Sequence, residues 1–107
     1  MMTEVAQNLK VSDRPVVKKI FDENGTKIMA IGLRRGVELA EHVAPCKAKL
    51  LVVQGEIDFN TEMESKRFAR YESYDIPMNV KHSVVAWDDA IFLLFLNEKN
   101  ERYRDKE

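Results

Sequence analysis

Two histidines, His42 and His82, are the residues of this sequence best suited to chemistry near neutral pH. They are the only histidines in the chain, and each lies among turn and strand signals. Imidazole nitrogens bind transition metals and exchange protons in this pH range. In an antiparallel barrel, inward positions from strands far apart in sequence converge on one interior. We therefore expect both side chains to face one cavity, as half of a metal site or as contacts to an organic ligand.

Cys46 is the nearest candidate for a third metal ligand. It has the strand parity of His42, Ala44 and Ala48, so on an ideal strand it would share their face. Two imidazoles and a thiolate would suit a divalent transition metal such as zinc, nickel, iron or manganese. The alternative is that Cys46 is a small, partly buried hydrophobic residue. Because it is the only cysteine, no intrachain disulfide can form, which is typical of a reducing compartment.

Short apolar segments separated by turns predict an all-β fold. The expected strands cover residues 16–20, 26–34, 48–53, 57–60, 68–76, 80–87 and 90–96. The segment 68–76 is expected to be broken near Glu72-Ser73, and residues 61–66 read as a polar connection. Asn24-Gly25 is typical of a hairpin turn. Residues 1–15 are expected to form an N-terminal arm, residues 16–97 the barrel, and residues 98–107 a charged tail. This arrangement of short strands favours a sandwich or a jelly-roll barrel.

The charge balance and the lengths of the apolar runs exclude several partners. Seventeen basic and 18 acidic side chains nearly cancel, so neither nucleic acid nor an anionic membrane is expected as a partner. The longest apolar run, residues 90–96, is much shorter than the roughly 20 residues that a membrane-spanning helix needs. The N-terminus lacks the basic and apolar regions of a secretory signal. We expect a cytoplasmic protein.

The spacing of the two histidines resembles the two motifs of the cupin family. Gly36, His42 and Gly55 stand where the first motif has Gly, His and Gly, and Pro77 and His82 match the Pro and the His of the second. The resemblance covers roughly residues 26–96. It implies the cupin double-stranded β-helix, which is an all-β jelly-roll barrel, and it implies that the motif histidines belong to a site inside this barrel.

Five motif positions carry other residues. Ala44 and Ala48 stand in place of the second His and the Glu, so two of the family's four metal ligands are absent. Tyr71 and Asn79 stand in place of two glycines, and Ala86 in place of the Asn. The resemblance therefore supports the fold more than the metal chemistry. Any metal is expected to bind weakly and to be unnecessary for folding.

Three functions remain open, and the first is favoured. A non-catalytic module would bind a small, mostly apolar or weakly acidic ligand in the barrel cavity. Its lining would comprise His42, His82, Ala44, Ala48, Leu50 and Val52. The second possibility is a metal-dependent enzyme with a reduced ligand set, of the oxygenase or isomerase type that the resemblance implies. The third is a structural or interaction partner that has no ligand.

A homodimer is expected from the apolar residues on the second face of one strand. Leu51 and Val53 alternate with Ala48, Leu50 and Val52, so both faces of this strand need cover. A barrel has only one interior. A second sheet, the N-terminal arm or a partner subunit must therefore cover part of the outer face.

Overall fold

The first sheet begins with the hairpin predicted at Asn24-Gly25. The computed structural model describes residues 13–44 and 46–97. Both turn residues have positive φ, 53° for Asn24 and 81° for Gly25, as a type I′ turn requires. The turn joins β1 (Val16–Glu23) to β2 (Thr26–Leu33). The hairpin prediction is confirmed.

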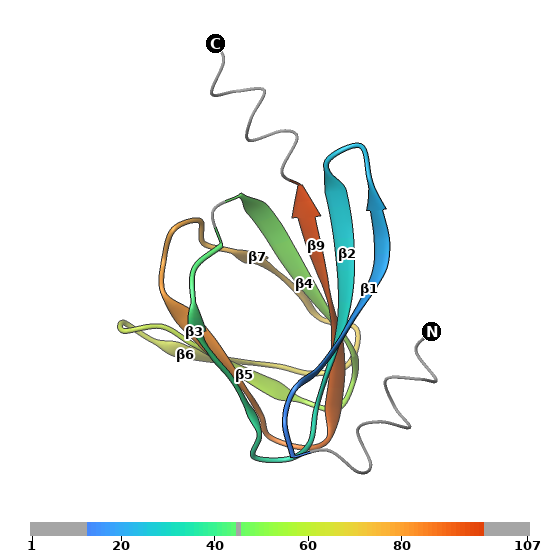
Figure 1. Ribbon diagram of the computed structural model, residues 1–107. Helices are drawn as coiled ribbons and strands as arrows, with labels where there is room; N and C mark the ends of the chain where they lie inside the picture. Colours follow the sequence, from blue (N-terminus) through green and yellow to red (C-terminus); the bar gives the residue numbers. More distant parts are fainter. Residues whose placement is uncertain (1–12, 45, 98–107) are drawn as a thin grey trace.

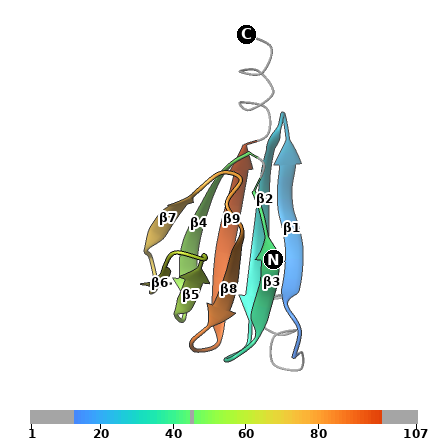
Figure 2. The same cartoon turned by 90° about the vertical axis from the view of Figure 1, so that its left-hand side faces the viewer.

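The described residues form nine strands in two antiparallel sheets, which face each other (Figures 1 and 2). The five-stranded sheet has the order β1-β2-β9-β4-β7, and the four-stranded sheet has the order β3-β8-β5-β6. The other strands are β3 (Glu38–His42), β4 (Lys47–Gln54), β5 (Ile57–Asn60), β6 (Ser65–Phe68), β7 (Ser73–Ile76), β8 (His82–Ala86) and β9 (Ala90–Asn97). The all-β prediction is confirmed.

The core lies between the two sheets because alternate residues of each strand point inward. On β4, Ala48, Leu50 and Val52 are buried while Lys47 and Lys49 are exposed. Inward residues of both sheets join them in one apolar cluster that includes Ile31, Leu33, Ile57, Phe59, Val84, Ala86 and Phe92. Burial of this apolar surface is the main stabilising contribution to such a fold.

The two sheets come together where β8 turns into β9 (Figure 1). At this end the turn at Gly55 packs against the backbone of Asp89 and Ala90, and the Trp87 amide donates to the Glu56 carbonyl at 2.9 Å. The Asp89 carboxylate accepts a bond from the Arg35 amide at 2.8 Å. Three turns distant in sequence are thus joined by backbone contacts and by one bond to a side chain, and they close one end of the barrel.

The prediction for residues 61–66 is partly wrong. Ser65 and Lys66 belong to β6, where they pair with Asn60 and Phe59 of β5. β6 is an edge strand with mostly exposed side chains, so it needs apolar residues at few positions and its sequence resembles a polar loop. The break predicted near Glu72-Ser73 is present as a longer turn over residues 69–72, which separates β6 from β7. β3, like β6, was not predicted as a separate strand.

The predicted arm and tail lie almost wholly outside the described residues. The first strand begins at Val16 and the last one ends at Asn97. Among the described residues there is no helix long and apolar enough to cross a membrane.

Candidate functional site

The burial of inward side chains on β2 and β9 decreases from the β8–β9 turn toward the other end of the barrel. Near the β8–β9 turn, the inward residues Leu33, Ala90 and Phe92 are fully buried. Toward the other end of the same strands, inward apolar side chains that pack on the core are only partly buried. We term this end the mouth and define it by Met29 on β2 and by Leu94 and Leu96 on β9. An apolar interior that stays partly open to solvent at one end is the usual form of a small-molecule site.

His82 is the first residue of β8, so it lies at the end of this strand away from the β8–β9 turn. Its side chain is 2% exposed, and it is the one buried polar or charged residue in the described part of the chain. Nδ1 lies 3.0 Å from the carbonyl oxygen of Val80. Since a carbonyl only accepts, Nδ1 carries the proton of this bond, and a neutral ring then has its acceptor at Nε2. The bond to Val80 fixes the tautomer of this imidazole.

An aromatic row leads from His82 to the edge of the barrel. The imidazole stacks on Phe59 with ring centroids 4.7 Å apart. Phe59 contacts Tyr74 edge-on at 5.1 Å, and Tyr74 lies 4.8 Å from Phe68. The Lys66 ammonium lies 5.1 Å from the centre of the Tyr74 ring. Four strands, β5 to β8, contribute to this row, so it holds His82 in a rigid apolar setting.

The structure places four of the predicted wall residues, Ala44, Ala48, Leu50 and Val52, together in the apolar cluster between the sheets. Cys46 is buried and forms no disulfide, and it is not part of that cluster. The backbone of His42 pairs directly with that of His82, whereas the His42 side chain is outside the described part of the structure. The complete set of cavity residues therefore stays a prediction.

The donor set of the described residues does not fit the four-ligand metal site that the cupin motifs imply. Ala44 and Ala48 are 7% and 8% exposed at the positions of two family ligands, and they contribute only methyl groups. Among the side chains that the structure describes, no group of three or more His, Cys, Asp or Glu residues could hold a metal ion. The proposed ligand trio of His42, His82 and Cys46 remains a prediction.

Two lysines at inward positions were missed by the sequence analysis. Lys27 pairs with Leu96 of β9, and Lys66 pairs with Phe59 of β5, so both share a face with core residues. The parity of Lys27 with Met29 and its inward neighbours along β2 is a sequence signal that could have identified it. No such signal existed for Lys66, since its strand was not predicted.

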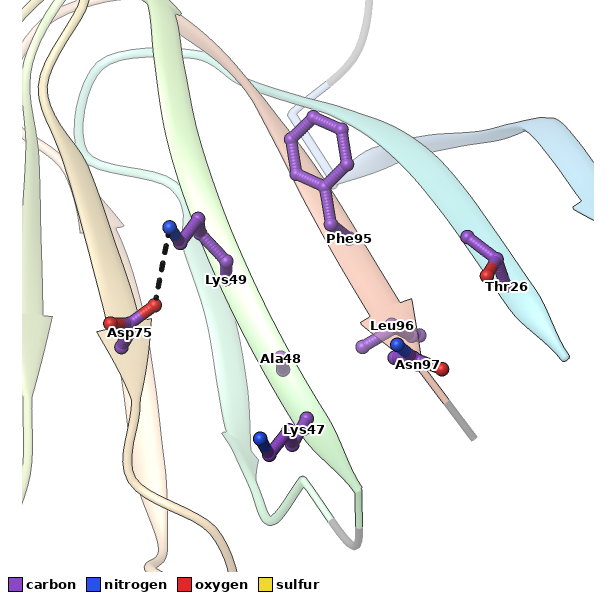
Figure 3. A pocket seen from close by; sticks show the side chains of 8 residues that line it. All are labelled: Thr26, Lys47, Ala48, Lys49, Asp75, Phe95, Leu96 and Asn97. Atoms are coloured by element: carbon purple, nitrogen blue, oxygen red, sulfur yellow. Dashed lines mark ion pairs between the residues drawn. The ribbon is translucent and has the colours of Figure 1, made fainter. Parts of the chain in front are cut away.

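A groove of about 270 Å³ lies at the mouth end of the five-stranded sheet (Figure 3), and it is lined by outward residues together with Ala48 and Leu96. Figure 3 shows Lys49 on β4 beside Phe95 on β9, with Asp75 on β7 across from the lysine. The Lys49–Asp75 ion pair measures 3.5 Å between Nζ and Oδ1, and both side chains are largely exposed. An exposed pair of this kind contributes little binding or stability. The barrel interior is therefore the better candidate site.

Similar solved structures define the class of this fold. A conserved protein with a double-stranded β-helix domain from Klebsiella pneumoniae superposes with a TM-score of 0.76 at 17% identity, covering 90% of this chain and 88% of that chain. An RmlC-like cupin from Desulfovibrio desulfuricans gives 0.73 at 22% identity, covering 79% and 83%. The conserved protein SPY1581 of unknown function from Streptococcus pyogenes gives 0.73 at 20% identity, covering 80% and 75%.

The chain therefore has the cupin fold, and the jelly-roll prediction is confirmed. No family model matches the sequence, and no curated protein matches it either. At these identities the structural likeness establishes the fold, while the function must be argued from the site.

Proposed function

We propose that this protein binds a small, mostly apolar molecule in the mouth of its barrel without catalysing a reaction. The observation that carries this proposal is the setting of His82. Among the side chains that the structure describes, it is the one buried polar group, and it stacks on Phe59 and is oriented by the Val80 carbonyl. Small-molecule sites are typically apolar with a few oriented polar groups.

The chemistry of the interior favours binding over catalysis. Ala44 and Ala48 replace two donors that the cupin motifs would supply. The described inward positions of β2 and β4 to β9 hold no carboxylate that could act as a general base beside His82. One imidazole orients a ligand readily, whereas metal chemistry in proteins generally uses three or more ligands.

A metal-dependent enzyme with a reduced ligand set is the second candidate. The direct backbone pairing of His42 with His82 supports it, because this register brings the two histidines of the chain together on adjacent strands. Metal analysis of protein purified without a histidine tag distinguishes the two candidates. Stoichiometric, tightly held metal would favour the enzyme. A cytoplasmic location and a homodimeric state are part of the main proposal.

Native mass spectrometry of the purified protein tests the main proposal. We expect a co-purifying small molecule that is lost in Leu94→Trp, because Leu94 is a partly buried inward residue at the mouth. Phe95→Trp is the matched control, since the adjacent residue faces outward and lines the groove in Figure 3. Thermal melts of both variants report whether each is folded. If no small molecule is bound, and none from a broad library raises the melting temperature, the proposal is wrong.

A further inference from the structure

Lysines outnumber carboxylates among the charged residues on the core face of the strands. On β1, Lys19 and Asp22 lie opposite Met29 and Lys27 and form an ion pair with each other. By strand register, β2 and β4 to β9 place two charged side chains on the face of the core, and both are lysines. Lys27 lies in the row of Leu96 and Ala48, at the mouth. Lys66 lies over Tyr74 at the edge of the barrel. The described interior thus combines an apolar wall with positive charge.

The two lysines differ in their partners. The Lys66 ammonium lies 3.7 Å from the Glu64 carboxylate and its side chain is 43% exposed, so part of its charge is already balanced. Asp22 lies opposite Lys27 on β1, but its ion pair is with Lys19 at 3.1 Å. No described carboxylate forms an ion pair with Lys27. Lys27 is therefore the stronger candidate for contact with a ligand.

We infer that the ligand is an amphipathic monocarboxylate whose negative charge pairs with Lys27 while its apolar body lies against Met29, Leu94 and Leu96. This inference rests on the proposed function and specifies its ligand class. Lys27 is partly buried as a residue, and a cation near apolar side chains of low dielectric constant attracts an anion more strongly than a cation in bulk water does. The same charge disfavours a cationic ligand and provides nothing for a neutral one.

Isothermal titration calorimetry with three probes of equal chain length tests the charge preference. The probes are octanoate, octanol and octylammonium, each used below its aggregation concentration. We expect octanoate to bind about fivefold or more tightly than octanol, the size expected of a charge-assisted contact at a partly exposed site. Octylammonium should bind more weakly than octanol. The preference for octanoate should decrease as the salt concentration rises.

Three variants locate the charge that is responsible. Lys27→Gln should remove most of the preference for octanoate, and Lys27→Arg, which keeps the charge, should retain it. Lys49→Gln is the matched control, because Lys49 is a lysine on the outer face that lines the groove in Figure 3. Circular dichroism melts establish that each variant is folded. If Lys27→Gln does not fold, retention of the preference by Lys27→Arg and its loss at high salt still decide the question.

The outcomes separate this inference from the proposed function. Equal binding of octanoate and octanol would overturn the monocarboxylate inference and leave an apolar binding module. Binding of none of the three probes would count against both. A preference for octanoate that survives Lys27→Gln, or that is lost in Lys49→Gln, would overturn the inference by placing the charge elsewhere.

Discussion

Replacement of Gly55 by alanine should destabilise this protein more than the same replacement at the turn glycine Gly36. Gly55 has a φ of 75°, which is in the left-handed region that residues with a Cβ rarely adopt. A Cβ at this position would overlap with the carbonyl oxygen of Asp89 and lie 2.9 Å from the Cα of Ala90. Both are backbone atoms in the turn before β9, so they cannot rotate away as a flexible side chain could.

Two contributions set the expected magnitude. The left-handed conformation costs a residue with a Cβ about 1–2 kcal/mol, and moving well-packed groups to admit an extra methyl costs about 1–3 kcal/mol. Their sum, about 2–5 kcal/mol, is a large part of the roughly 5–15 kcal/mol that stabilises a typical domain. The melting temperature of Gly55→Ala should therefore be lower than that of the unmodified protein by about 10 °C or more.

Gly36→Ala provides the matched control. Gly36 has a φ of 83°, but a Cβ there would meet no atom within 4 Å, so only the conformational cost of about 1–2 kcal/mol applies. Urea titrations followed by circular dichroism give the free energy of unfolding of each variant. The difference between the two variants isolates the contact with Asp89 and Ala90. If the two free energies agree within about 0.5 kcal/mol, the range of neutral surface changes, the reasoning is wrong.

Three further predictions concern the motif positions and the outer face. Tyr71→Gly should stabilise the protein by about 0.5–1 kcal/mol, because Tyr71 has a φ of 71° and glycine relieves that strain at some entropic cost. Asn79→Gly should change the free energy of unfolding little. Urea titrations measure this free energy for both variants. Ala44→His combined with Ala48→Glu should raise metal affinity in a competition assay with a chelating dye. In the unmodified protein, a chelator should leave the melting temperature unchanged, and a large decrease in the melting temperature would contradict this. Light scattering should show a dimer at micromolar concentration that Leu51→Glu converts to a monomer, and a monomeric unmodified protein would refute the outer-face interface.

The sequence predicted the fold well where local patterns decide it. Asn24-Gly25 determines the type I′ hairpin because both positions need positive φ. The segment at β4 alternates so strongly that its inward residues could be named in advance. β6 could not be recognised in this way. Its residues are largely exposed, and its pairing with β5 depends on backbone bonds that any polar sequence can make.

The candidate site was less accessible from sequence, because it depends on which strands are neighbours. Lys27 and Leu96 lie at opposite ends of the described chain, and β9 brings them together by inserting between β2 and β4. Strand order of this kind follows from the whole packing of the two sheets rather than from any local signal. The partly buried mouth and its positive charge therefore follow from the pairing register of the strands, which the sequence alone does not determine.

The replaced motif positions divide into two groups with different physical causes. Tyr71 and Asn79 stand where the cupin motif has glycine, and both keep the positive φ that a glycine would adopt, 71° and 63°. The Tyr71 amide donates to the Val52 carbonyl at 2.7 Å, and the Asn79 amide donates to the Ala44 carbonyl at 2.9 Å. These bonds tie each turn to the barrel whatever its side chain, so the spacing of the motif follows from backbone geometry.

Ala44, in the loop before β4, and Ala48, on β4, by contrast carry methyl groups where the cupin motif has donors. Both residues are buried in the apolar cluster between the sheets, so each contributes a methyl group to the core at a position where the motif would supply a metal ligand. The spacing of the motif thus reflects the positions of turns and strands, whereas the residue types at its positions determine the chemistry of the site. Because the turns are kept while two donors are absent, the same fold can present an apolar, lysine-rimmed interior in which His82 is the buried polar group that the structure describes.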